Sequence, residues 1–194
     1  FGSSLDKRKI IGLVSDTKWN EFIELNRMAL ADWLPRNGES RAISVWMKLL
    51  KKHYPHLKWV ISFADGTQCG DGTIYRASGF VLTGIKKNDS LYQMPDGSIL
   101  HEWLIRVDNT ELKKEVMKLS NGSASLKRWK EKTGILPLNG FQLRYIYFLD
   151  PSYKVKLTVP ILPFSKIDEM GAGMYKGIKR VADDSNPVQQ GVAV

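Results

Sequence analysis

The chain has 194 residues, 43% of them apolar, with a formal net charge of +9 and a pI near 9.6. Its single cysteine excludes an internal disulfide, and no apolar run approaches the roughly 20 residues that a membrane-spanning helix needs. We therefore expect a protein of a reducing cytoplasm, with one domain over residues 1–181 and a flexible tail over 182–194. Because the chain opens on Phe1 rather than Met, we expect further residues upstream.

The residue pattern predicts alternating helices and strands. Apolar residues from Ala42 to Leu50 recur at the spacing of an amphipathic helix, whereas residues 57–64 are apolar and rich in β-formers. The predicted elements are a strand in the second half of 20–32, a helix over 40–53, a strand over 57–64, a helical turn over 73–77, a strand over 79–85, a hairpin from 91–92 and 99–107, a basic helical stretch over 110–133, and a hairpin from 142–149 and 155–161. This order predicts an α/β (α+β) fold with a mixed central sheet flanked by helices.

The positive charge is interleaved with aromatic residues, which favours a nucleic acid as partner. Cations can hold phosphates, and aromatic rings can stack on bases. The candidate nucleic-acid-binding residues are Lys113, Lys114, Lys127, Arg128, Lys130 and Tyr145. The alternative for the tyrosines is that they alternate only because they lie in strands.

The junction from Tyr75 to Phe80 carries a tyrosine separated by three residues from a Gly-Phe pair. This spacing resembles that of acyl-CoA-dependent transferases of the GNAT superfamily, in which the phenol lies at the reacting centre. Tyr75 is therefore a candidate general acid to a leaving thiolate, or an orienting hydroxyl. The alternative is a packing tyrosine at the end of a helix.

Two charged residues on strands complete the predicted catalytic set. Asp65 ends the strand over 57–64, where a carboxylate could accept a proton, bind a metal or hold a base, although Asp-Gly is also a common turn pair. Arg27 is predicted in a strand, where a buried guanidinium would bind an anion or a carboxylate. We expect Tyr75 and Asp65 to converge on one cleft beside an anion-binding helix end.

That helix end is predicted at the turn before the helix over 40–53. Unpaired amides and the helix dipole favour an anion there, in GNAT proteins the pyrophosphate of coenzyme A. The candidate cofactor-binding residues are Arg36, Asn37, Gly38, Ser40 and Arg41. Glu39 opposes an anion, and Ser40 is equally suited to cap the helix.

Four segments resemble the Mom family of bacteriophage DNA-modification proteins, which are GNAT-related: LNRMALADWLPRNGESRA, WVISFADGTQCGDGTIYRASGF, MPDGSILHEWL and GAGMYKGIKR. The resemblance extends over about residues 1–180. It implies a GNAT-like core and an enzyme of the host bacterial cytoplasm that converts adenine N6 of double-stranded DNA to a carbamoylmethyl adenine, protecting phage DNA from restriction. It also implies acetyl-CoA or a related CoA thioester, and iron.

Candidate metal ligands are few. His101 follows the Met-Pro-Asp-Gly turn and, with Asp71, could contribute to an iron site, although Asp71 is also placed to cap the helical turn that carries Tyr75. Cys69 lies in a polar turn, where a nucleophilic thiolate is the alternative chemistry.

Two other functions fit the same residues. One is a GNAT enzyme acting on a protein or a small amine. The other is a non-catalytic DNA-binding module on the same scaffold, because Glu39 and the single glycine of the 36–42 turn depart from the usual GNAT pattern.

Overall fold

The computed structural model describes residues 1–4, 6–31, 33–67, 70–88, 90–94, 97–102, 114, 117–118, 134–175 and 178–179. The chain divides into two compact units, one of Phe1–Ile85 with Gln142–Val194 and the other of Lys86–Phe141. The predicted tail over 182–194 lies outside the described residues. Within the described ranges, no helix has the length and apolar character to cross a membrane.

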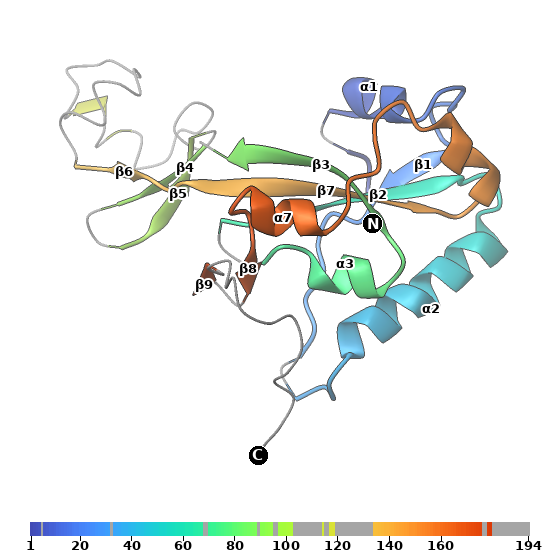
Figure 1. Ribbon diagram of the computed structural model, residues 1–194, viewed down its shortest axis with the longest axis horizontal. Helices are drawn as coiled ribbons and strands as arrows, with labels where there is room; N and C mark the ends of the chain where they lie inside the picture. Colours follow the sequence, from blue (N-terminus) through green and yellow to red (C-terminus); the bar gives the residue numbers. More distant parts are fainter. Residues whose placement is uncertain are drawn as a thin grey trace. The chain divides into compact units, whose positions relative to one another are not determined.

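The first unit is built on a four-stranded sheet in the order β1-β2-β7-β3 (Figure 1). These strands are β1 (Phe22–Glu24), β2 (Trp59–Asp65), β3 (Val81–Asn88) and β7 (Gly140–Phe148). β1 and β2 are parallel and are joined by helix α2 (Gly38–His53), as parallel neighbours require a crossover. β7 pairs antiparallel with β2 along its whole length, from Trp59↔Phe148 to Asp65↔Gln142.

Helices cover both faces of this sheet (Figure 1). One face carries α2 and the short helix α3 (Thr73–Ala77). The other carries α1 (Lys7–Ile10), the 3-10 helix η1 (Ile11–Leu13) and the 3-10 helix η2 (Pro151–Lys156). Helix α7 (Ser165–Glu169) and the pair β8 (Met174–Tyr175) and β9 (Ile178–Lys179) follow η2.

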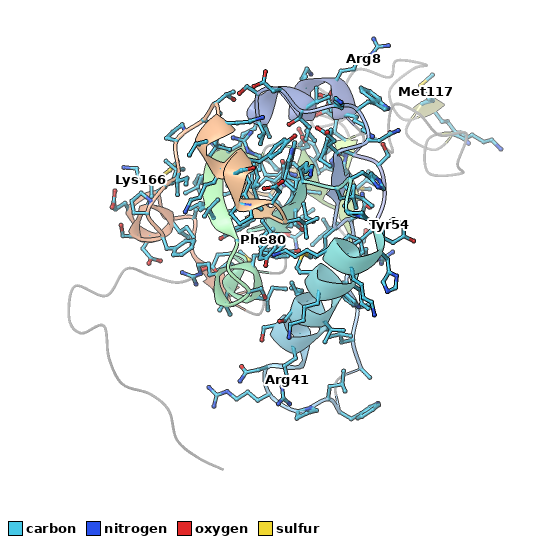
Figure 2. All side chains as sticks on the ribbon, turned by 90° about the vertical axis from the view of Figure 1, so that its right-hand side faces the viewer. Arg8, Arg41, Tyr54, Phe80, Met117 and Lys166 are labelled. Atoms are coloured by element: carbon cyan, nitrogen blue, oxygen red, sulfur yellow. The ribbon has the colours of Figure 1, made fainter. Side chains whose placement is uncertain are left out.

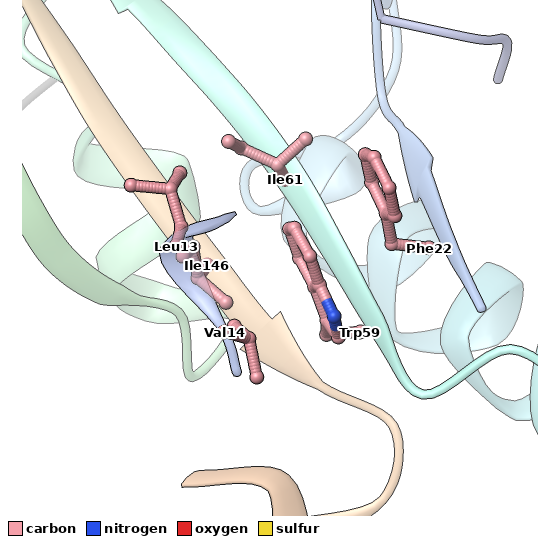
Figure 3. Close-up of a cluster of buried hydrophobic side chains, with 6 residues drawn as sticks. All are labelled: Leu13, Val14, Phe22, Trp59, Ile61 and Ile146. Carbon is pink, nitrogen blue, oxygen red and sulfur yellow. The ribbon is translucent and has the colours of Figure 1, made fainter. Parts of the chain in front are cut away.

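The main apolar cluster lies on the α1 and η2 face (Figure 3). The Phe22 and Trp59 rings stack with centroids 4.4 Å apart, and the indole Nε1–H of Trp59 donates to Thr17 Oγ1 at 3.1 Å. Ile61 and Ile146, which are cross-strand partners, are both fully buried beside them. Trp59 is therefore part of the core, whereas Trp19 is 51% exposed.

The second unit contains a separate three-stranded sheet in the order β5-β4-β6. It comprises β4 (Leu91–Gln93), β5 (Ile99–His101) and β6 (Leu136–Pro137), all antiparallel. The β4-β5 pair confirms the predicted hairpin around the 94–97 turn. Of the basic stretch expected over 110–133, only residues 114, 117 and 118 are described, so the helical stretch, with its expected break at 120–123, stays a prediction.

Most elements match the sequence prediction, with two corrections. The strand expected in the second half of 20–32 lies in the first half, as β1, because only Phe22–Glu24 pairs with β2. The hairpin expected after β7 is absent, since Pro151–Lys156 forms η2 instead of a strand. Asp150 favours the start of η2 at this point, because its carboxylate accepts hydrogen bonds from the Ser152 amide at 3.1 Å and from the Ser152 hydroxyl at 2.7 Å.

Candidate functional site

The helical turn that carries Tyr75 is closed by a C-terminal cap. Gly79 has φ +82°, and the Phe80 amide donates to the Tyr75 carbonyl at 3.0 Å. The Ser78 amide donates to the Ile74 carbonyl at 3.1 Å, and the Tyr75 and Phe80 rings lie 5.3 Å apart. A glycine in left-handed conformation, a bond that spans the last turn and an apolar contact across it are the features of a Schellman cap. The spacing of Tyr75 and Gly79-Phe80 therefore has a local structural cause, independent of any chemistry.

The Tyr75 side chain lies in the interior of the α2 and α3 face. It is 9% exposed, and its ring also lies 5.3 Å from that of Tyr145. Burial raises the pKa of the Tyr75 phenol above its ordinary value, a hydrogen bond with Ser62 lowers it in part, and the negative charge of Glu24 raises it. Tyr75 therefore stays protonated at neutral pH, as a proton donor must.

Ser62 is the polar neighbour that sequence reasoning missed. It is fully buried on β2, where it is the cross-strand partner of Tyr145, and its hydroxyl donates to the Leu25 carbonyl at 2.9 Å. The available signal was a lone serine within the apolar run over 57–64. A buried hydroxyl needs partners, so such a serine marks a specific hydrogen-bonding environment.

Asp71 is the centre of a second polar cluster, with Thr73, Arg76 and Tyr145 as its partners. Its carboxylate is 1% exposed, accepts a hydrogen bond from Thr73 Oγ1 at 2.9 Å, and lies 3.5 Å from the Arg76 guanidinium. Its backbone carbonyl accepts a hydrogen bond from the Tyr145 hydroxyl. The prediction that Asp71 caps α3 is wrong, since Gly72 occupies the N-cap position with φ +82°.

Asp65 does not share a face of the sheet with Tyr75. Successive strand side chains alternate between faces, so Asp65 lies on the side of Phe63, opposite that of Ser62. Its Oδ1 accepts the Thr67 amide at 2.9 Å, which organises the turn after β2. The expected convergence of Tyr75 and Asp65 on one cleft is therefore wrong, and the turn role is the one observed.

Arg27 is also placed differently from the prediction. It is exposed and lies beyond the end of β1, so it is not the buried strand arginine that we expected. The reason is that the chain leaves the sheet directly after Leu25, whose amide donates to the Ile61 carbonyl at 2.9 Å.

The cations predicted to bind a cofactor are exposed around the N-terminus of α2. Arg36 and Arg41 are exposed, and Asn37 occupies the N-cap in left-handed conformation with φ 69°, without a capping bond from its side chain. Helix α2 begins at Gly38. The prediction that Ser40 caps the helix is wrong, since Asn37 occupies the N-cap and the Ser40 hydroxyl donates back to the Asn37 carbonyl at 3.1 Å.

Among the residues that the structure describes, no group of three His, Cys, Asp or Glu could hold a metal ion. His101 is exposed on β5 in the second unit, whereas Asp71 is buried in the first unit. Cys69 lies outside the described residues.

Most of the predicted DNA-binding residues fall outside the described ranges, namely Lys113, Lys127, Arg128 and Lys130. Lys114 is described and exposed. Tyr145 is fully buried, because its ring packs on Tyr75 and its hydroxyl reaches Asp71, so the prediction that it stacks on a base is wrong.

Comparison with known proteins decides the family. The profile of the Mom protein family matches residues 1–166, which include every element of the first unit up to the start of α7. This chain belongs to the Mom family. A Mom relative, the methylcarbamoylase Mom of Escherichia phage Mu, is 33% identical over 162 residues, which cover 83% of this chain and 62% of that protein. The chain thus spans less than two thirds of the length of this relative.

Proposed function

We propose that this Mom-family chain is a phage enzyme that converts adenine N6 in double-stranded DNA to a carbamoylmethyl adenine, and so protects the DNA from host restriction. The observation that carries the proposal is the family match over residues 1–166, together with the name methylcarbamoylase of the phage Mu relative. The net charge of +9 agrees with a polyanionic substrate. Modification of a base favours its extrusion from the stack, which costs a few kcal/mol that phosphate contacts can offset.

Within this function, the phenol of Tyr75 is the proposed proton donor. Burial raises the pKa of this phenol further above physiological pH, and the Ser62 hydroxyl lowers the pKa in part. The rings of Phe80 and Tyr145 restrict its orientation from two sides. A neutral phenol in fixed orientation can donate a proton or a hydrogen bond to a leaving group.

The proposed cofactor is acetyl-CoA or a related CoA thioester. Attack of adenine N6 on its carbonyl carbon would expel the CoA thiolate and give an N6-acyl adenine, so the bond between N6 and the carbamoylmethyl methylene carbon is not assigned to this step. The residues at the start of α2 fit the phosphates of this cofactor in part. Arg36 and Arg41 are exposed cations, and the Asn37 side chain leaves the first-turn amides uncapped. The exposed carboxylate of Glu39 in the same turn opposes an anion. The order β1-α2-β2-α3-β3 supports a GNAT-like transferase.

Iron does not fit the described residues, because they offer no set of three ligands. No step of the proposed chemistry is therefore assigned to a metal. The chemistry assigned to this chain is proton donation from Tyr75 and anion binding at the start of α2.

The test is a nucleoside analysis after expression of the chain in a bacterial host. Host DNA is digested to nucleosides, and a mass-shifted deoxyadenosine is sought for the wild type and for Tyr75→Phe. The matched control is Tyr153→Phe, which removes a phenol oxygen that bonds Glu21 Oε2 at 3.3 Å on the other side of the sheet. We expect the wild type and the control to give the product and Tyr75→Phe to lose it by about 10²-fold or more.

The outcomes separate the three functions. A modified deoxyadenosine that persists in Tyr75→Phe would remove the proton-donor role and leave the phenol a packing group. Unmodified DNA with a modified protein or small amine would favour a different transferase. DNA binding with no product from any variant would indicate a non-catalytic module.

A further inference from the structure

Helix α2 presents one continuous exposed face of cations and apolar side chains, here called the outer α2 face. Its members are Arg41, Val45, Lys48, Leu49 and Lys52. They recur at helical spacing and are all exposed, whereas Ile43, Met47 and Leu50 on the opposite side are buried. Val45 and Leu49, one helical turn apart, are 52% and 48% exposed. Figure 2 shows Arg41 at the periphery and Phe80 in the interior.

Cations predominate along this helix. Residues 40–53 contain four Lys or Arg and no Asp or Glu, and Glu39 in the first turn is the single acidic residue of α2. The helix dipole accounts for the basic residues of the last turn, Lys51 to His53. It does not account for Lys48, one turn earlier, nor for the exposed Val45 and Leu49.

The basic residues around α1 and η2 differ in this respect. There, carboxylates pair with two of the lysines: Asp6 with Lys9 at 2.9 Å and Asp16 with Lys156 at 3.9 Å. α1 and η2 also cover the sheet face opposite Tyr75. Helix α2 contacts α3, and the ammonium of Lys51 lies 5.7 Å from the Tyr147 ring centroid on the Tyr75 face.

We propose that the outer α2 face docks in the major groove of duplex DNA. This inference rests on the proposed function and adds the surface that binds its substrate. The major groove admits a helix and displays adenine N6, the atom to be modified. A helix of 16 residues is about 24 Å long, enough to follow the groove. Lys48 and Lys52 contact phosphates, and Val45 and Leu49 contact thymine methyl groups.

The test of the phosphate contacts measures the affinity of the full chain for a labelled duplex, by fluorescence anisotropy, from about 50 to about 200 mM salt. Lys48→Gln/Lys52→Gln removes two charges from the outer α2 face. Arg8→Gln/Lys154→Gln removes two exposed charges from α1 and η2, and neither residue forms an ion pair among the described residues. We expect Lys48→Gln/Lys52→Gln to lower the slope of log affinity against log salt concentration by about 1.8. Its loss of affinity between about 50 and about 200 mM salt should therefore be about 12-fold smaller than that of the wild type. Arg8→Gln/Lys154→Gln should keep the wild-type slope.

The apolar contacts have their own readout. Val45→Asn/Leu49→Asn should abolish a wild-type preference for thymine over uracil in otherwise identical duplexes, because only thymine carries the C5 methyl group. The six replaced side chains are exposed, so all three double variants should retain the wild-type unfolding free energy within about 0.5 kcal/mol.

Three results would overturn the inference. An unchanged slope in Lys48→Gln/Lys52→Gln would contradict the phosphate contacts. Equally lowered slopes in Lys48→Gln/Lys52→Gln and Arg8→Gln/Lys154→Gln would show a general effect of net charge. Dimerisation of the wild type in sedimentation that Val45→Asn/Leu49→Asn abolishes would assign the face to a second copy of the chain. Binding through α2 without modified nucleosides would instead contradict the proposed function alone.

Discussion

Gly72 lies against the ring of Tyr145, and its replacement by alanine tests how tightly the region around Tyr75 and Tyr145 is packed. A Cβ at Gly72 would lie 2.5 Å from Tyr145 Cε2, 2.8 Å from Cζ and 3.0 Å from the phenol oxygen. Tyr145 cannot easily move away, because it is fully buried, its strand lies between β2 and β3, and its hydroxyl bonds the Asp71 carbonyl. Gly72 also has φ +82°, where an alanine is strained.

The size of the effect follows from these two terms. Left-handed backbone costs a residue with a Cβ about 1–2 kcal/mol, and overpacking of a buried region costs about 1–3 kcal/mol. Gly72→Ala should therefore lower the unfolding free energy by about 2–5 kcal/mol. Gly171→Ala is the matched control, since Gly171 has φ +62° and nothing lies within 4 Å of a Cβ built there. It should lose only the backbone term.

Urea unfolding followed by circular dichroism measures both variants. The expected result is that Gly72→Ala is less stable than Gly171→Ala by about 1–3 kcal/mol, with equal m-values. Equal losses of unfolding free energy in the two variants would refute this reasoning. They would show that the Tyr145 ring moves aside without an energetic penalty and that the packing around Tyr75 is loose.

Two further predictions concern the Tyr75 phenol and the apolar cluster. Because the folded-state pKa of Tyr75 is raised above the ordinary value of 10.0, its neutral form adds stability that is fully present below that pH and is lost as pH rises through the folded-state pKa. Tyr75→Phe should therefore show a shallower fall in unfolding free energy than the wild type between about pH 9 and about pH 11, and parallel curves would contradict the shift. Ile146→Ala, at a fully buried position, should lose about 2–5 kcal/mol in urea unfolding, whereas Ile161→Ala, 45% exposed, should lose less than about 0.5 kcal/mol; similar losses would argue against the cluster.

Local patterns predicted the elements that depend on local interactions. The helix over 40–53 corresponds to α2, the run over 57–64 to β2, and residues 73–77 to α3 with the same bounds. Helical spacing, a continuous apolar run and the Gly79 cap are all written within a few neighbouring residues. The same holds for the β4-β5 hairpin, whose turn has Gly97 at φ +84°.

The errors at β1 and η2 arose where local signals competed. Alternation over 155–161 predicts a strand, yet the Asp150 carboxylate binds the Ser152 amide and hydroxyl, and the chain turns into η2. Residues 20–32 alternate throughout, but only Phe22–Glu24 finds a partner on β2. Pairing between strands is a non-local choice that alternation alone does not specify.

By itself, the sequence determined the family, the basic character and the local elements, because each is recorded in residues that are close along the chain. The tertiary structure alone decided which side chains meet. The insertion of β7 between β2 and β3 buries Tyr145 against Tyr75, and the alternation of β2 assigns Ser62 and Asp65 to opposite faces. The physical reason is that a strand defines two faces locally, but only packing against distant elements decides which face becomes the interior.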